Sequence, residues 1–118
     1  MKNTKKLTLL LIFIFLFPGC ATTKTVCDTE CEAQDRRHTY ILANPELHAK
    51  YKKSILLGRV SLGMSKEDVI AALGHPKTRV DTNAFWVERE QWVYELPHTT
   101  DFYYFKFGQL NRWSTLSD

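Results

Sequence analysis

The sequence contains no apolar run long enough to cross a membrane. Its longest, residues 7–17, has eleven residues, whereas a transmembrane helix needs about 20. The sequence also has no phosphate-binding loop, no nucleophile elbow and no zinc-binding motif. Its four histidines are widely separated, and none is next to a nucleophile pattern. These absences predict a protein that is not an enzyme and has no metal site and no cofactor.

Basic residues are only slightly in excess, and the excess lies at the N-terminus. The formal net charge is +3, and Lys2, Lys5 and Lys6 all precede the apolar run. Without residues 1–19 the 16 basic residues fall to 13, which equals the 13 acidic residues. A nucleic-acid-binding surface needs clustered basic residues. The balanced charge therefore argues against a nucleic-acid partner.

The N-terminus has the pattern of an export signal. Three lysines followed by a short apolar run are typical of a secretory signal peptide. The segment Leu16-Phe17-Pro18-Gly19-Cys20 resembles the lipobox of bacterial lipoproteins. This resemblance implies that residues 1–19 are a lipoprotein signal peptide and that Cys20 is lipidated. It also implies, because Ala21 follows, an anchor in outer-membrane lipid with the chain facing the periplasm. The alternative is conventional cleavage near Ala21, with Cys20 removed.

Two further cysteines form an even pair in an oxidising compartment. Cys27 and Cys31 have the spacing Cys-x-x-x-Cys, which differs from the Cys-x-x-Cys of redox sites. A local disulfide between them is expected, and pairing with a partner protein is the alternative. A zinc site would need two more ligands at suitable spacing.

Residues 20–43 are predicted to be a lipidated flexible tether. Their low hydrophobicity and mixed charge disfavour independent folding. A short helix from Glu30 to His38 is the alternative. A tether of this kind would set the distance between the membrane and the folded domain.

The folded domain is predicted to span residues 44–118 and to begin with a helix. Asn44 as N-cap and Pro45 at the first helical position form a strong helix start, and Gly58 ends the helix. Its buried stripe is expected to be Leu47, Tyr51, Ile55 and Leu56. Its exposed lysines, which are candidates for contacts with lipid head groups and otherwise a solvated surface, are Lys50, Lys52 and Lys53.

A second helix is expected from Ser65 to Leu73. Ser65 can cap its N-terminus and form a capping box with Asp68. Gly74 can adopt the left-handed conformation that ends a helix, and Pro76 prevents continuation. The buried stripe of this helix is expected to be Val69, Ile70 and Leu73.

After Pro76 the hydrophobic period changes from helical to alternating, which predicts strands over 77–81, 88–96, 101–107 and 110–115. Glu90 is assigned to the solvent side of its strand. Gly108 predicts a hairpin turn, centred on 107–108 or 108–109. One face of this hairpin is expected to carry Tyr103, Phe105, Phe107 and Leu110. The other is expected to carry Phe102, Tyr104 and Trp113.

These elements predict an α+β fold with two N-terminal helices on one face of a small three- to four-stranded antiparallel sheet. Two helices can cover only one face of such a sheet. Either the tether covers the second face, or Phe102, Tyr104 and Trp113 form an aromatic patch that binds a partner.

Several segments together resemble the SmpA/OmlA domain of BamE-type outer-membrane lipoproteins. They are Gly58-x-Val60-x-Leu62-Gly63-Met64-Ser65 with Val69, Leu73-Gly74-x-Pro76, Trp92-x-Tyr94 and Phe105-x-x-Gly108-x-Leu110. The resemblance covers about residues 55–113, with Phe107 in place of the more usual turn asparagine. It implies two helices on a small antiparallel sheet, no catalytic residues and no cofactor. It also implies contacts with subunits of the outer-membrane barrel-assembly machine and with anionic phospholipid.

The sequence therefore predicts an outer-membrane lipoprotein that acts as a structural or interaction module in outer-membrane protein assembly or envelope maintenance. A barrel-assembly subunit is a candidate partner. The alternative is a periplasm-facing lipoprotein that binds or inhibits a partner enzyme through its sheet.

Overall fold

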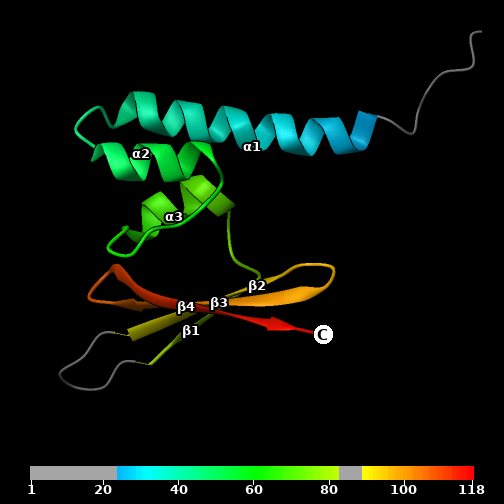
Figure 1. The fold of residues 1–118 in the computed structure, drawn as a ribbon, viewed down its shortest axis with the longest axis vertical. Coiled ribbons are helices and arrows are strands. Elements are labelled where there is room, and N and C mark those ends of the chain that lie inside the picture. Colours follow the sequence, from blue (N-terminus) through cyan, green and yellow to red (C-terminus); the bar gives the residue numbers. More distant parts are fainter. Residues whose placement is uncertain (1–23, 83–88) are drawn as a thin grey trace, which may run out of the picture.

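In the part of the chain that the structure describes, three helices lie on one side of a four-stranded antiparallel sheet with strand order β1-β2-β3-β4 (Figure 1). The computed structural model describes residues 24–82 and 89–118, with side chains from residue 29 onward in the first range. The predicted α+β class with an antiparallel sheet is confirmed. The predicted signal peptide and Cys20 lie outside the described residues. The elements are α1 Lys24–Ala43, α2 Ala49–Leu56, α3 Lys66–Leu73, β1 Thr78–Asp81, β2 Arg89–Glu95, β3 Thr99–Lys106 and β4 Gln109–Ser117.

Helix α3 is the element that the sequence specifies most completely. The Ser65 hydroxyl accepts a hydrogen bond from the Asp68 N–H at 3.1 Å, and the Asp68 carboxylate accepts one from the Ser65 N–H at 3.0 Å. This reciprocal pair is the predicted capping box. Gly74 follows the helix with φ 87°, a conformation that side chains with a Cβ disfavour. Val69 is fully buried, as predicted.

Helix α2 begins later than predicted. Its N-cap is His48, whose ring nitrogen Nδ1 accepts a hydrogen bond from the Lys50 N–H. Asn44 instead serves the preceding helix, because its side-chain amide donates to the Tyr40 carbonyl at 2.8 Å. Ile55 is buried, but Leu56 is 43% exposed and does not widen the buried stripe.

The prediction of a flexible tether over residues 20–43 is corrected from Lys24 onward, because Lys24–Ala43 forms α1. The second half of α1 is fixed by side chains that reach α3. Arg36 Nε donates to the Ala71 carbonyl at 3.3 Å, and Arg37 Nε donates to the Ala72 carbonyl at 3.1 Å. These carbonyls lie in the last turn of α3, where they have no partner inside the helix. A polar segment is thus ordered by long-range contacts that composition does not reveal.

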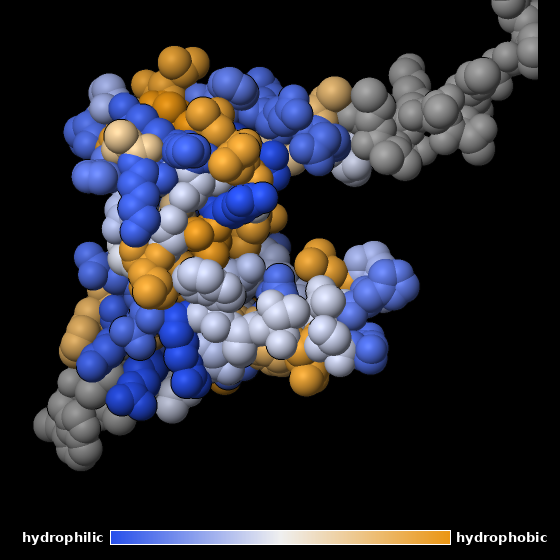
Figure 2. Space-filling view, in the orientation of Figure 1, coloured by the Kyte–Doolittle hydropathy of each residue, from blue (hydrophilic) through white to orange (hydrophobic). Residues whose placement is uncertain are grey.

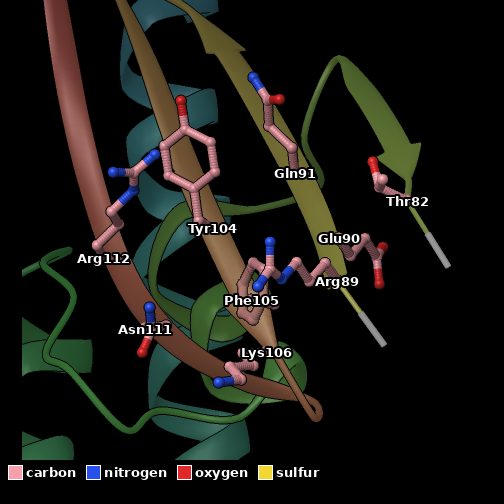
Figure 3. Close-up of a pocket in the computed structure, with 9 residues that line it drawn as sticks. All are labelled: Thr82, Arg89, Glu90, Gln91, Tyr104, Phe105, Lys106, Asn111 and Arg112. Carbon is pink, nitrogen blue, oxygen red and sulfur yellow. The ribbon is translucent and has the colours of Figure 1, made fainter. Parts of the chain in front are cut away.

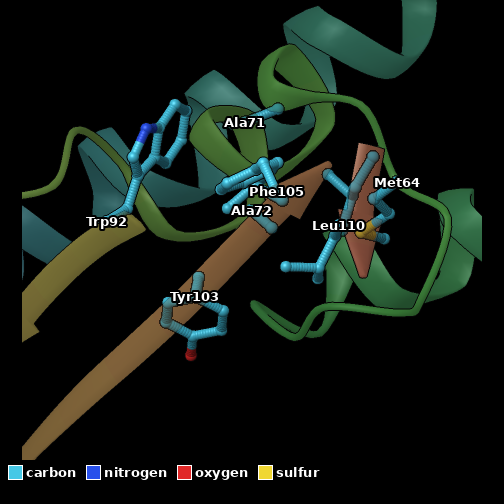
Figure 4. Packing of buried hydrophobic residues seen from close by; sticks show 9 residues of the cluster. Met64, Ala71, Ala72, Trp92, Tyr103, Phe105 and Leu110 are labelled. Carbon is cyan, nitrogen blue, oxygen red and sulfur yellow. The ribbon is translucent and has the colours of Figure 1, made fainter. Parts of the chain in front are cut away.

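The core lies between α3 and the centre of the sheet (Figure 4). The Trp92 and Phe105 rings pack at 4.5 Å between centroids, in a tilted arrangement. Ala71 and Ala72 present small side chains to these rings, which lets α3 approach the sheet closely. The buried hydrophobic residues are Ile55, Met64, Val69, Ala71, Ala72, Trp92, Tyr103, Phe105 and Leu110.

The β3–β4 hairpin turns at Phe107-Gly108, with φ of 50° and 74°. Positive φ at both central residues is the pattern of a type I′ turn. Phe107 is 62% exposed and does not belong to the buried face on which it was predicted.

A β-bulge changes the predicted face of Trp113. Phe105 pairs with Leu110, but Tyr104 pairs with Arg112, so Asn111 is an extra residue in β4. An extra residue moves every later side chain of the strand to the opposite face. Trp113 therefore pairs with Tyr103 on the helix-facing side, not with Phe102 and Tyr104. It is 45% exposed there. The sheet extends beyond α3 (Figure 1), and Figure 2 shows an open recess between α1 and this end of the sheet.

The loop before α3 closes the start of the outer edge of β4. The Gly63 N–H donates to the Leu110 carbonyl, and the Leu110 N–H donates to the Met64 carbonyl, both at 2.8 Å. Ser65 and Gln109 form an isolated bridge at the same place. The helix layer is thereby joined to the sheet edge by backbone hydrogen bonds.

Candidate functional site

The side of the sheet that faces away from the helices carries a cluster of apolar and basic side chains, here called the bare face. Strand pairing aligns Val80, Gln91, Tyr104 and Arg112 in one row across all four strands. A second row aligns Val93, Phe102 and Ser114, and Leu116 follows on β4. Helix α1 lies on the other side of the sheet, so within ranges 24–82 and 89–118 no element covers the bare face (Figure 1).

The predicted aromatic patch is therefore divided between two surfaces. Phe102 and Tyr104 lie on the bare face, half-buried by their neighbours, and Trp113 lies on the opposite side. Val80 and Leu116 add apolar surface, being 46% and 60% exposed. Sequence reasoning missed these two residues, and for Leu116 regular alternation from the buried Leu110 would have predicted the opposite face, because it does not include the bulge at Asn111.

A hollow of about 490 Å³ lies at one end of the bare face, toward the β3–β4 turn (Figure 3). Figure 3 shows Tyr104 between Arg112 and Gln91, with Arg89 and Lys106 farther along the same strands. The Arg112 guanidinium stacks on the Tyr104 ring at 4.3 Å from its centroid. The residues that line the hollow are Thr82, Arg89, Glu90, Gln91, Tyr104, Phe105, Lys106, Asn111 and Arg112.

Among the described residues that line this hollow, positive charge predominates. Arg89 and Lys106 are directly opposite each other in the β2–β3 ladder, and like charges in such a pair repel. Among the described residues, no carboxylate forms an ion pair with Arg89, Lys106 or Arg112. A carboxylate-bearing ligand at the hollow would relieve this repulsion.

Glu90, the one acidic residue among the described residues of the lining, has its side chain on the helix-facing side. It forms an ion pair with Lys66 of α3 and accepts a hydrogen bond from Trp92 Nε1. Its side chain is 11% exposed, so its predicted place on the solvent side is wrong. Glu90 has the same strand parity as the buried Trp92, and this parity predicts its orientation correctly. Burial would raise the pKa of Glu90, but the hydrogen bonds from Lys66 and Trp92, with the charges of Lys66 and Arg79, lower it below its ordinary value.

Asp68 is a second buried carboxylate, at the junction of α1 and α3. It is 4% exposed and, besides the capping box, accepts a hydrogen bond from the Tyr40 hydroxyl at 2.7 Å. Burial and this bond to Asp68 both raise the pKa of Tyr40. The Ser65 N–H and the Tyr40 hydroxyl both donate hydrogen bonds to this buried carboxylate, as buried polar groups require. We therefore assign Asp68 a structural role.

The remaining predicted site residues lie on the helical side. Lys50 and Lys53 are exposed on α2, whereas the Lys52 ammonium donates to the Pro45 carbonyl at 2.7 Å. The three lysines are thus not equivalent. They lie away from the bare face (Figure 1).

The cysteine pair falls within α1. Cys31 is exposed, and Cys27 lies four residues earlier on the same helix, among residues whose side chains are not described. Their disulfide stays a prediction, as does lipidation of Cys20.

The described surfaces carry side chains that are suited to binding. No group of three or more metal-ligating side chains occurs in the part of the chain that the structure describes. In the same part, no helix has both the length and the apolar character that a membrane crossing requires. Aromatic, aliphatic and cationic side chains on a rigid sheet are suited to contacts with another macromolecule.

Comparison of the chain with protein-family models, with curated proteins and with solved structures gives no match.

Proposed function

We propose that this chain is a lipid-anchored interaction module of the outer membrane whose bare face binds a protein partner in the cell envelope. The observation that supports the proposal most strongly is the bare face itself. Val80, Phe102, Tyr104 and Leu116 present apolar and aromatic surface from three strands, on a side that no described element covers. Surfaces of this kind commonly mark protein contacts.

The charge of the bare face narrows the kind of partner. Arg89, Lys106 and Arg112 surround one end of the apolar rows. A partner segment with apolar side chains and at least one carboxylate would complement both features. The resemblance to BamE-type lipoproteins favours a subunit of the barrel-assembly machine or another envelope protein.

The anchor rests on the signal-like N-terminus and on Cys20. In a Cys20→Ala variant the chain cannot be lipidated at this position. We expect it to move from the outer-membrane fraction to the soluble periplasmic fraction when envelopes are separated by density. Unchanged membrane association would contradict lipid anchoring through Cys20.

The partner surface is tested with a photo-crosslinking residue at position 104. Its matched control is the same residue at Lys53, which is exposed on α2 on the helical side. We expect a covalent adduct with an envelope protein from position 104 and none from position 53. Recovery of a soluble hydrolase from position 104 would instead support the enzyme-inhibitor alternative. Equal adducts from both positions, or none, would contradict binding at the bare face.

A further inference from the structure

The outer edge of β4 is open over most of its length. β4 is the last strand of the sheet, and the loop segment Gly63–Ser65 closes its outer edge only as far as Leu110. Beyond Leu110, no segment of ranges 24–82 and 89–118 pairs with this edge. Figure 1 shows this end of β4 projecting past α3.

The direction of the backbone groups along this edge follows from strand pairing. The Asp118 N–H donates to the His98 carbonyl, which makes these two residues a hydrogen-bonded pair of the β3–β4 ladder. In an antiparallel ladder such pairs alternate with pairs whose backbone groups point outward. The N–H and C=O groups of Trp113, Thr115 and Ser117 therefore point away from β3, toward the open edge.

This edge lacks the features that normally prevent strand addition. Residues 113–117 include no charged residue and no proline. The opposite edge of the sheet is different, because β1 has four residues and includes Arg79 and Asp81. The open part of β4 is thus the better template for another strand.

We propose that a second copy of this chain pairs antiparallel with the open edge of β4, with the two-fold axis at Thr115. This register places Thr115 opposite Thr115 of the second copy, and Trp113 opposite its Ser117. Trp113, Thr115 and Ser117 of both copies are then hydrogen-bonded. With the axis at Ser114 instead, Ser117 would lie opposite Asn111, the extra residue of the bulge.

The charges of Arg112 and Asp118 and the length of the open edge of β4 both favour this register. With the axis at Thr115, Arg112 lies opposite Asp118 of the second copy, and symmetry repeats the pair. The Gly63–Ser65 segment ends its contact at Leu110, so the second copy occupies the open length without displacing it. Helix α3 of the two copies lies toward opposite ends of the joined sheet, because α3 covers only the other end of β4, whereas α1 extends above the open end (Figure 1).

The test is a disulfide across the proposed axis in the full-length chain, with Cys27 and Cys31 changed to serine. Facing Cα atoms of a hydrogen-bonded antiparallel pair are about 5.5 Å apart, within the range that a disulfide spans. We expect Thr115→Cys to form a covalent dimer under mild oxidation. The matched control is Ser117→Cys, whose counterpart lies about 13 Å away along the strand. We expect this control and the parent without a new cysteine to stay monomeric.

Two outcomes overturn the proposal: no dimer from Thr115→Cys, or an equal yield from Ser117→Cys. A charge exchange tests the register independently. In the Thr115→Cys background, Arg112→Asp and Asp118→Arg should each lower the dimer yield severalfold, and the two together should restore it. Because Arg112 also stacks on Tyr104, only the restoration isolates the contact between copies. Failure of the double variant to restore the yield rejects the register centred on Thr115.

Discussion

At the scale of single residues, Asp68 links two elements that are far apart in the sequence. Its carboxylate accepts a hydrogen bond from the Ser65 N–H in the capping box of α3, and another from the Tyr40 hydroxyl of α1. A buried carboxylate is costly unless hydrogen bonds replace its hydration. The Tyr40 contact therefore supports both the cap of α3 and the docking of α1.

The Tyr40→Phe substitution should destabilise the protein by about 1–2 kcal/mol, because a buried charged acceptor loses one donor. Urea unfolding followed by circular dichroism measures the difference. The matched control is Tyr51→Phe, which removes an exposed hydroxyl that donates to the Leu62 carbonyl at 3.2 Å. An equal or larger loss in the control would contradict a special role for the Tyr40–Asp68 contact.

Phe107 has a positive backbone φ, which is unfavourable for a residue with a bulky side chain. Its φ is 50° and its ring is 62% exposed, so strain is not offset by burial. Phe107→Asn should stabilise the protein by about 0.5–1 kcal/mol, since asparagine tolerates the left-handed region. Thermal unfolding measures the gain. Phe107→Ala, which removes the ring but keeps the strain, should give no such gain.

At the scale of elements, α1 depends on α3. Arg36 and Arg37 donate to carbonyls in the last turn of α3, where positive charge also complements the helix dipole. Gly58 leaves room for this arrangement, because an added Cβ would lie 2.6 Å from Arg37 Nη2. The order of α1 is thus a tertiary effect.

Replacing both arginines by glutamine should loosen α1 and leave α3 and the sheet folded. We expect faster amide hydrogen exchange over residues 32–43, corresponding to a loss of about 1 kcal/mol of local stability. Arg59→Gln, in the exposed loop after α2, is the control and should leave exchange in α1 unchanged. Unchanged exchange in the double variant would contradict docking through these side chains.

Sequence patterns correctly predicted those features whose stabilising contacts are between residues close together in the sequence. The capping box and terminal glycine of α3 were confirmed, because every partner lies within a few residues. Asn44 was assigned to α2 but serves α1, since the same residue can end one helix or begin the next. Helix α1 was expected only as an alternative, over Glu30–His38, because its partners Ala71, Ala72 and Asp68 lie in another element.

The sequence predicted the bare face only in part, because its full set of residues depends on the pairing register of the strands. Alternation placed Phe102 and Tyr104 together, but it could not include the extra residue Asn111, which reverses the later part of β4. The basic hollow was missed because Arg89, Lys106 and Arg112 come from three strands, and only the register brings them together.

At the scale of the whole molecule, the ion pair between Glu90 and Lys66 joins the sheet to the helix layer. Interactions with Lys66, Trp92 and Arg79 hold the pKa of Glu90 below its ordinary 4.5 in the folded state. The unfolded chain therefore binds the proton more readily. The stabilisation is complete above pH 4.5 and is lost as pH falls through the lowered folded value.

Glu90→Gln should therefore flatten the dependence of unfolding free energy on pH below 4.5. Urea unfolding at a series of acidic pH values measures this slope. Glu46→Gln, an exposed residue in the turn before α2, provides the comparison. If Glu90→Gln keeps the slope of the parent, acid destabilisation arises from other groups.

The bulge at Asn111 also has a consequence for how this surface can change in evolution. Deletion of that one codon would restore regular alternation and turn Trp113 onto the bare face, where it would join Phe102 and Tyr104. The same step would move Arg112 to the helix-facing side. A single in-frame deletion would thus replace Arg112 by Trp113 on the bare face, while Arg89 and Lys106 would keep their places there.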